Sequence, residues 1–138
     1  MERAEAIKKT FDYLMDCGVF FYATSDEDGK AHVRPFGFAD ILEDGNLYFG
    51  MGSYKRSYKE TEKNPYVEIC ACKGTEWLRI RGKAVFNFDA NEQLFVKPQH
   101  AFLKAKYGPE SELTHAPFYL ENMEIDFNDK TGRCDKWL

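Results

Sequence analysis

Short runs of aromatic and β-branched residues, separated by tight turns, occupy most of this chain. The turns read "DEDGK" at residues 26–30, "EDGN" at 43–46 and "KGT" at 73–75. Two such runs joined by a short turn that contains glycine form an antiparallel hairpin. A small sheet built from successive hairpins exposes its edges unless it closes on itself. The sequence therefore predicts a mainly β fold, a small antiparallel barrel of six or seven strands with helices at its openings.

The patterns also predict where the elements lie. Strands are expected over residues 19–25, 31–42, 47–50, 66–73, 76–88, 117–127 and 132–137. Helices are expected over residues 2–16, in a short segment capped by Ser53, over 90–97 with an Asp89/Glu92 capping pattern, and in a piece that ends near Tyr107. In the first helix the expected apolar stripe consists of Ala4, Ile7, Phe11, Leu14 and Met15, and Gly18 is the expected stop.

Length and charge limit what the chain can do. Its 138 residues suit a single domain, residues 1–138. The net charge of -4 argues against general nucleic-acid binding, which usually requires a basic balance. No apolar run approaches the roughly 18 residues of a membrane helix, and "MERAEAIKK" lacks the apolar region of a signal peptide. We therefore expect a cytoplasmic protein without a membrane or nucleic-acid partner.

The residues that could bind a metal are scattered along the chain: Cys17, Cys70, Cys72, Cys134, His32, His100 and His115. A zinc site needs two Cys or His pairs at ligand spacing, so no metal site is predicted. Disulfides are rare in the cytoplasm, and free cysteines are usually buried. We expect four ordinary thiols, buried or half-buried.

The stretch "MGSYKRSYKETEKNP", residues 51–65, connects two expected strands and is the most informative motif for function. It gathers cations and hydroxyl groups at the start of a short helix: Lys55, Arg56, Lys59, Ser53, Ser57 and Tyr58. Exposed amides at a helix N-terminus favour anions, and lysine and arginine add positive charge. The motif is not a Walker sequence, but it suits a phosphate monoester. The alternative is a solvated basic helix with no ligand.

The strand pattern "AHVRPFGFADIL" places His32, Arg34, Phe36 and Phe38 on one face. Pro35 removes a backbone donor, which is typical of an edge strand or an irregular position. Backbone groups at such an edge are available to something other than a neighbouring strand. The alternative is a surface arginine on a bent barrel strand.

In "EWLRIRG", Trp77 and Arg79 share one face with Arg81, while the intervening apolar residues point the other way. A tryptophan beside an arginine can stack on a flat ring or on a guanidinium group. The alternative is a packed tryptophan with arginines that extend into solvent.

These blocks together resemble a known family. "HVRPFGF", "LYFGMGSYKRSYKETEKNPYVEIC" and "EWLRIRGKAVF", in this order and spacing, are similar to the pyridoxamine 5'-phosphate oxidase-like flavoproteins, and most similar to the short branch that includes nitroimidazole-reductase-related proteins. The resemblance covers roughly residues 5–127, and the basic stretch that ends in Asn64-Pro65 is its most specific part. It implies an FMN-binding split β-barrel and a homodimer with two flavins at the subunit interface.

The resemblance also implies which residues bind FMN. They form four groups: a strand that meets the isoalloxazine ring and ribityl chain (Arg34, Pro35, Phe36), the next strand's end beside the ring (Gly50, Met51), the phosphate region (Ser53, Lys55, Ser57, Lys59), and a strand that reaches the flavin from the partner subunit (Trp77, Arg79). The oxidase proper has a basic residue where this chain has Ser57, so Lys55 or Lys59 must serve instead. The substrate-binding arginines and C-terminal segment of the true oxidase are not recognisable, so vitamin B6 synthesis is not predicted.

The function implied is that of an FMN-dependent oxidoreductase. A reduced nicotinamide would pass hydride to the flavin, which would pass electrons to a small acceptor such as a nitroaromatic compound. No catalytic residue is predicted, and His32 is a candidate only by its place beside Arg34. Two alternatives stay open: a non-catalytic flavin-binding or redox-sensing protein, and a barrel of the same fold that uses deazaflavin or haem.

Overall fold

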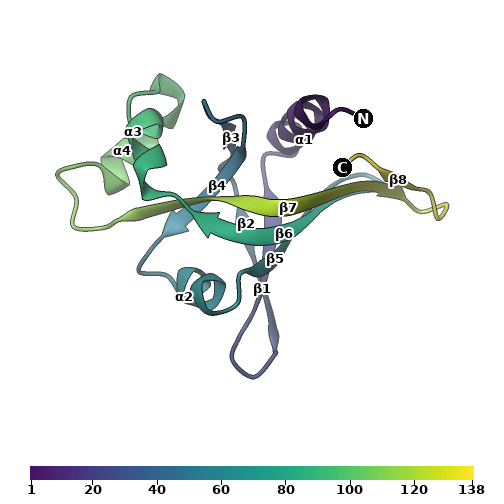
Figure 1. The fold of residues 1–138 in the computed structure, drawn as a ribbon, viewed down its shortest axis with the longest axis horizontal. Coiled ribbons are helices and arrows are strands. Elements are labelled where there is room, and N and C mark those ends of the chain that lie inside the picture. Colours follow the sequence, from purple (N-terminus) through teal and green to yellow (C-terminus); the bar gives the residue numbers. More distant parts are fainter.

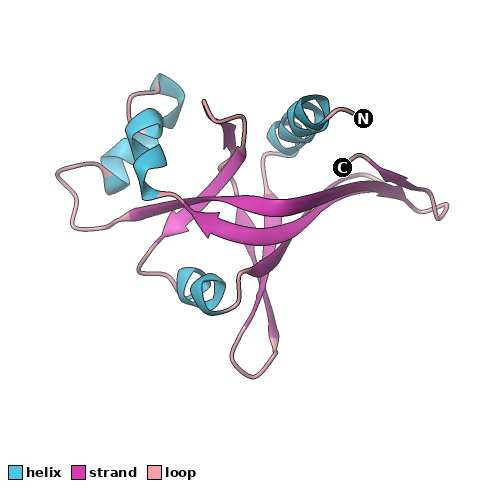
Figure 2. Cartoon of the chain, viewed as in Figure 1, coloured by secondary structure: helices cyan, strands magenta, loops and turns pink.

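The computed structural model describes all residues, 1–138. A strongly curved antiparallel sheet forms its centre, and helices lie around the sheet (Figures 1 and 2). The strands are β1 (Phe20–Ser25), β2 (Ala31–Phe36), β3 (Asp40–Ile41), β4 (Leu47–Gly52), β5 (Tyr66–Lys73), β6 (Glu76–Phe86), β7 (His115–Asp129) and β8 (Cys134–Lys136). The helices are α1 (Arg3–Cys17), α2 (Arg56–Lys63), α3 (Asn91–Leu94) and α4 (Ala101–Tyr107), with short 3-10 turns η1 (Phe88–Ala90) and η2 (Pro98–His100).

The strand order is β2-β1-β5-β6-β7-β4-β3, with β8 paired to β7, and every pairing is antiparallel. The strands β2 and β3 lie at the two ends of this order and do not pair with each other, so the barrel stays split. The predicted class, a mainly antiparallel split barrel with flanking helices, is confirmed. The edge position that Pro35 indicates is also confirmed, because β2 is an edge strand.

The predicted single strand over residues 31–42 is wrong, because the chain forms two strands there, β2 and β3, which brings the sheet to eight strands. Between them the chain leaves the ladder with β1 so that Phe38 can enter a second apolar cluster. The other buried members of that cluster are Leu42, Tyr48, Ala90, Leu94, Leu103 and Tyr107. Burial of Phe38 against the segment that holds α3 and α4 therefore outweighs continuation of the strand.

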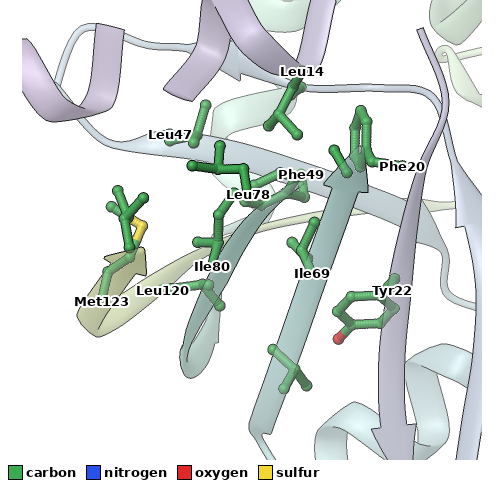
Figure 3. Close-up of a cluster of buried hydrophobic side chains, with 14 of the residues drawn as sticks. Leu14, Phe20, Tyr22, Leu47, Phe49, Ile69, Leu78, Ile80, Leu120 and Met123 are labelled. Atoms are coloured by element: carbon green, nitrogen blue, oxygen red, sulfur yellow. The ribbon is translucent and has the colours of Figure 1, made fainter. Parts of the chain in front are cut away.

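The main core lies on the inner face of the sheet (Figure 3). The alternation along β6 is as predicted, because Leu78 and Ile80 are completely buried while Trp77 and Arg79 on the other face are half-exposed. The helix α1 covers one end of this core with Ile7, Leu14 and neighbouring side chains.

The first helix is confirmed, and Gly18 ends it with a left-handed φ of 75°. Its apolar stripe was only partly predicted. Ile7 and Leu14 are buried and Phe11 is half-buried, but Ala4 and Met15 are exposed. The buried stripe is completed instead by Ala6, Thr10 and Tyr13.

Of the three other helix predictions, two need correction. Ser53 does not cap α2, because the helix begins later, with Lys55 at the cap position and no side-chain cap. The predicted helix over residues 90–97 is reduced to η1 and α3, and neither Asp89 nor Glu92 caps it. The helical piece that ends at Tyr107 is confirmed as α4.

None of the helices is both long enough and apolar enough to cross a membrane. All four cysteines are free thiols. Cys17 and Cys70 are half-buried as expected, but Cys72 and Cys134 are exposed. Cys72 lies on the outer face of β5, and Cys134 lies on the short terminal strand β8. No other part of this chain covers either side chain.

Candidate functional site

Three elements that carry predicted site residues meet at one corner of the sheet. The helix α2 begins at Arg56, just after β4 ends at Gly52, and packs against β1 and β4. The edge strand β2 reaches the same corner, because Arg34 Nη2 lies 3.0 Å from Glu60 Oε1 on α2. The predicted residues of β2, β4 and α2 are therefore brought together within one chain.

The basic stretch leaves two cations without partners. Lys55 and Lys59 are exposed and form no ion pair within the chain, whereas Lys63 binds Glu27. No side chain caps α2, so the amides of Arg56 and Ser57 are free to bind solvent or an anion, whereas the Tyr58 N–H donates to the Lys55 carbonyl. Ser57, in this first turn, is only 5% exposed. These groups form a surface that can receive a phosphate.

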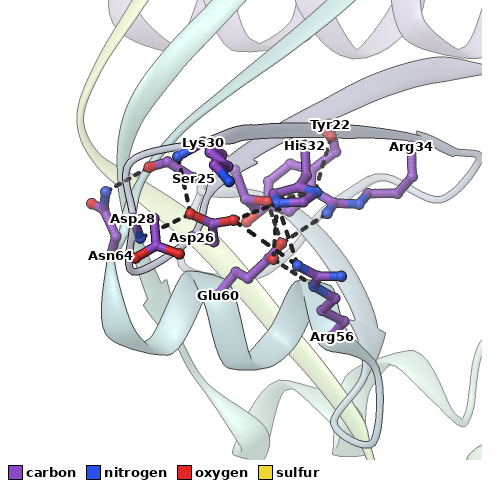
Figure 4. Close-up of polar contacts among 11 residues, drawn as sticks. Tyr22, Ser25, Asp26, Asp28, Lys30, His32, Arg34, Arg56, Glu60 and Asn64 are labelled. Atoms are coloured by element: carbon purple, nitrogen blue, oxygen red, sulfur yellow. Dashed lines mark hydrogen bonds and ion pairs between the residues drawn. The ribbon is translucent and has the colours of Figure 1, made fainter.

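Arg34 and Arg56 are bound to an internal carboxylate (Figure 4). Glu60 is 7% exposed, and its Oε1 accepts hydrogen bonds from Arg34 (3.0 Å) and from the Thr24 hydroxyl (2.8 Å). Its Oε2 accepts a hydrogen bond from Arg56 Nε at 2.9 Å. Arg34 also donates to Thr24 and to the backbone carbonyl of Tyr22. The guanidinium group of Arg34 is thus held by the protein itself.

The carboxylates of this corner are ionised at neutral pH. Burial raises the pKa of Glu60, and hydrogen bonds from Thr24 and Arg56 act in the opposite direction. The net result is a pKa below the ordinary value of a glutamate. The pKa of Asp26 is also lowered, chiefly by a hydrogen bond from His32, whose Nε2 lies 2.8 Å from Asp26 Oδ2. Two carboxylates therefore oppose the two guanidinium groups.

Apart from the exposed ring of Pro35, the strand residues predicted to meet the flavin ring offer mainly their backbones. The side chain of Phe36 stacks on Tyr22 with ring centroids 4.5 Å apart, and Met51 is buried in the main core. Gly50 has no room for a side chain, because an added Cβ would lie 2.3 Å from His115 Nε2. Pro35 is exposed on the edge of the sheet. Contacts from these positions to a ligand would come from the edge of β2 and the end of β4.

Trp77 and Arg79 lie on the opposite face of the sheet. The side chain of Arg34 is on the inner face, over the buried ring of Tyr22 at 5.7 Å. Trp77 and Arg79 point outward from β6, where Arg79 pairs with Asp126 at 3.3 Å. One chain therefore does not bring Trp77 and Arg79 to the corner that holds Arg34.

A polar cleft of about 680 Å³ opens beside α2. Its lining residues come from the β1–β2 turn and from α2: Ser25, Asp26, Glu27, Asp28, Arg56, Lys59, Glu60, Lys63 and Asn64. No predicted site residue except Lys59 lines it. The sequence prediction missed Glu60, Thr24 and Asp26. The i,i+4 spacing of Arg56 and Glu60 was a readable signal, but the contacts of Thr24 and Asp26 depend on the fold.

The phosphate of FMN fits part of this corner. Lys55, Lys59 and the amides of Arg56 and Ser57 are free to hold it, and Ser53 lies in the turn that precedes α2. Arg34 would have to release Glu60 before it could contribute. The phosphate region predicted from the sequence is thus available, with Arg34 outside it.

The comparisons with known proteins agree on the family. Residues 6–125 match the family model described as pyridoxamine 5'-phosphate oxidase. No curated protein matches the sequence.

Solved structures show the same fold. A NimC/NimA family protein from Clostridium acetobutylicum is 27% identical, with a TM-score of 0.79 over 94% of this chain and 92% of that one. A pyridoxamine 5'-phosphate oxidase-related, FMN-binding protein from Nostoc punctiforme is 18% identical, with a TM-score of 0.65 over 96% of this chain and 85% of that one. A haem-binding protein from Mycobacterium smegmatis is 12% identical, with a TM-score of 0.66 over 99% of this chain and 57% of that one.

The two low-identity structures support the fold alone, whereas the family model spans most of the chain, including the basic stretch and both arginine-bearing strands. The chain belongs to the pyridoxamine 5'-phosphate oxidase family.

Proposed function

We propose that this chain binds FMN and is an oxidoreductase that passes electrons from a reduced nicotinamide to a small-molecule acceptor. The observation that carries the proposal is the start of α2, where Lys55 and Lys59 are unpaired beside uncapped helix amides. Membership of the family and an FMN-binding structural relative support the same cofactor.

In this proposal Lys55, Lys59, Ser53 and Ser57 hold the phosphate, and the backbones of residues 34–36 and 50–51 border the flavin ring. FMN supplies hydride and electron-transfer chemistry when it is bound, toward an acceptor such as a nitroaromatic compound. The protein's own contribution is to bind and orient the cofactor and the acceptor. The four free thiols suit the reducing cytoplasm.

A homodimer is part of the proposal. Trp77 and Arg79 can join the corner that holds Arg34 only from a second copy, because the two sets lie on opposite faces of the sheet. The outer face carries exposed apolar side chains that a partner would cover: Phe21 is 47% exposed, Val33 67% and Tyr66 69%. A two-fold arrangement would complete two equivalent sites at once.

The histidines neither favour nor exclude haem. One ring nitrogen of each is in a hydrogen bond: His32 Nε2 with Asp26 at 2.8 Å, His100 Nε2 with Asp40 at 2.8 Å and His115 Nδ1 with Asn91 at 2.9 Å. Histidines that ligate a metal usually have their other ring nitrogen bonded in this way, so the spectrum of the bound cofactor has to decide. The alternative is a protein that stores flavin or senses redox state without turnover. Identification of the cofactor alone does not distinguish such a protein from an oxidoreductase.

The test is cofactor identification followed by turnover. The purified protein should show a flavin absorption spectrum, and mass analysis of the released cofactor should give FMN. Oxidation of reduced nicotinamide with a nitroaromatic acceptor should then depend on bound FMN. A haem or deazaflavin spectrum would overturn the cofactor proposal, and FMN binding without any turnover would favour the non-catalytic alternative.

A further inference from the structure

The carboxylate of Glu60 has the contacts that a bound anion usually has. It is 7% exposed, yet both oxygens are satisfied by charged or hydroxyl donors at 2.8–3.0 Å. The guanidinium groups of Arg34 and Arg56 converge on it from a strand and a helix that are far apart in sequence (Figure 4). Charge-assisted contacts of this kind are the ones arginine makes with phosphate groups in ligands.

The surroundings of Glu60 balance their own charges. Asp26 Oδ2 lies 4.0 Å from Arg56 Nη2 and 2.8 Å from His32 Nε2. His32 Nε2 is also 3.7 Å from Glu60 Oε2. The corner thus holds two arginines, two carboxylates and one histidine. The two carboxylates balance the positive charge of the two arginines. Lys30, Lys55 and Lys59 form no ion pair within the chain, and of these Lys55 and Lys59 lie at the start of α2 and in its first turns.

Two anions compete when they share the same cationic donors. A phosphate that approached Arg34 or Arg56 would meet a carboxylate already bound there, at a distance where like charges repel strongly in a partly buried site. The cleft of about 680 Å³ that Glu60 and Arg56 both line gives a free anion access to this position.

We infer that Glu60 is a specificity-determining residue, an internal anion that holds Arg34 and Arg56 away from the cofactor phosphate and so reduces the preference of this chain for FMN over riboflavin. The inference rests on the proposed function for its cofactor. It assigns the phosphate contacts to Lys55 and Lys59 in the native protein, and it predicts that a second set of phosphate donors is released when the charge of Glu60 is removed.

The variant Glu60→Gln tests this inference. The glutamine oxygen can still accept hydrogen bonds from Thr24 and one arginine, so the fold is preserved, but the competing charge is gone. The ratio of riboflavin Kd to FMN Kd, measured by flavin fluorescence titration, should rise by about tenfold or more over the wild-type ratio. Glu62→Gln is the matched control, because Glu62 lies on the same helix, is exposed and contacts only Tyr58.

A second readout does not need flavin. Inorganic phosphate, compared with chloride at equal ionic strength, should raise the Tm of Glu60→Gln more than that of the wild type or of Glu62→Gln. Glu60→Asp is a second variant, in which the charge is kept but drawn back from the arginines, and it should shift both readouts in the same direction by a smaller amount.

The outcomes separate the two proposals. If flavin binds but the ratio and the phosphate response are unchanged in both Glu60 variants, the inference is wrong and the proposed function stands. If no variant binds flavin but Glu60→Gln gains the phosphate response, the inference stands and the proposed cofactor is wrong. If no variant binds flavin and Glu60→Gln gains no phosphate response, both the inference and the proposed function are wrong.

Discussion

Trp77 and Arg34 can contact the same cofactor only in a dimer, and the fluorescence of Trp77 can report that contact. The chain has two tryptophans, and Trp137 stacks on Phe127 with ring centroids 5.5 Å apart. In a Trp137→Phe background, addition of FMN should strongly quench the fluorescence of Trp77. Trp77→Ala should weaken FMN binding by about 1 kcal/mol, the scale of one aromatic contact.

Energy transfer over a longer distance can also quench fluorescence, so the affinity of the alanine variant decides. Quenching without a change in FMN affinity would mean that Trp77 does not contact the flavin. Unquenched Trp77 emission would mean that the residue only packs on the outer face of the sheet.

His115 predicts a pH dependence of folding stability. It is 2% exposed, and burial lowers its pKa to about 4 from an ordinary 6.5. The unfolded chain therefore takes up a proton between pH 6.5 and 4 while the folded chain does not, so folding stability falls as the pH drops through this window. The loss should reach up to about 3 kcal/mol.

Urea denaturation at pH 7, 5 and 4 measures this effect, with His115→Gln as the comparison. The variant should have a flatter profile between pH 6.5 and 4. An equally steep profile in His115→Gln would show that other groups cause the loss.

At the scale of elements, a buried acid ties the helical segment to the sheet. Asp40, at the start of β3, is bound by Lys97 Nζ at 2.7 Å and His100 Nε2 at 2.8 Å, and both partners lie far from Asp40 in the sequence. Burial raises the pKa of Asp40, and these two partners act in the opposite direction. The net result is a pKa below the ordinary value of an aspartate. Its contribution to stability is therefore present at neutral pH and lost only as the pH falls below about 4.

Asp40→Asn should destabilise the fold by about 2 kcal/mol at pH 7, because a charged acceptor of two hydrogen bonds is removed. Asp12→Asn is the control, since Asp12 is exposed and pairs only with Lys8. Urea denaturation compares them at pH 7 and pH 3. A cost for Asp40→Asn that is the same at both pH values would contradict the role of its charge.

The patterns with a strong local cause were predictable from the sequence. The hairpins over β1–β2 and β5–β6 follow from turn residues and alternation, and Gly18 ends α1 as its position indicated. The break between β2 and β3 was not predictable, because it depends on the burial of Phe38 against helices that follow much later. The helix predicted over 90–97 is shorter in the structure for the same kind of reason. Leu94 is fixed by packing in the second apolar cluster, and no side chain caps the helix.

The candidate site was predictable as a set of positions but not as a set of contacts. The resemblance placed Lys55, Lys59 and Arg34 together, and the fold does bring their elements to one corner. It could not show that Glu60 already binds Arg34, because that contact joins a strand to a helix through side chains alone.

At the scale of the whole molecule, the exposed outer face of the sheet predicts a dimer. Sedimentation should give about twice the chain mass of 16.1 kDa. Val33→Asp, at a residue 67% exposed on the edge strand, should produce a monomer that loses FMN. Val96→Asp is the control, because Val96 is 78% exposed beside α3, away from that face. A monomer that retains FMN would contradict the shared site.

The central claim is that the start of α2 holds the phosphate of a flavin, and paired titrations with FMN and riboflavin test it most directly. Wild-type protein should bind FMN more tightly than riboflavin by about 2 kcal/mol or more, the scale of charge-assisted hydrogen bonds. Lys55→Ala with Lys59→Ala should remove this preference and leave riboflavin affinity unchanged, whereas Lys63→Ala, whose lysine is paired with Glu27, should keep it. Equal affinity of the wild type for FMN and riboflavin would contradict the claim.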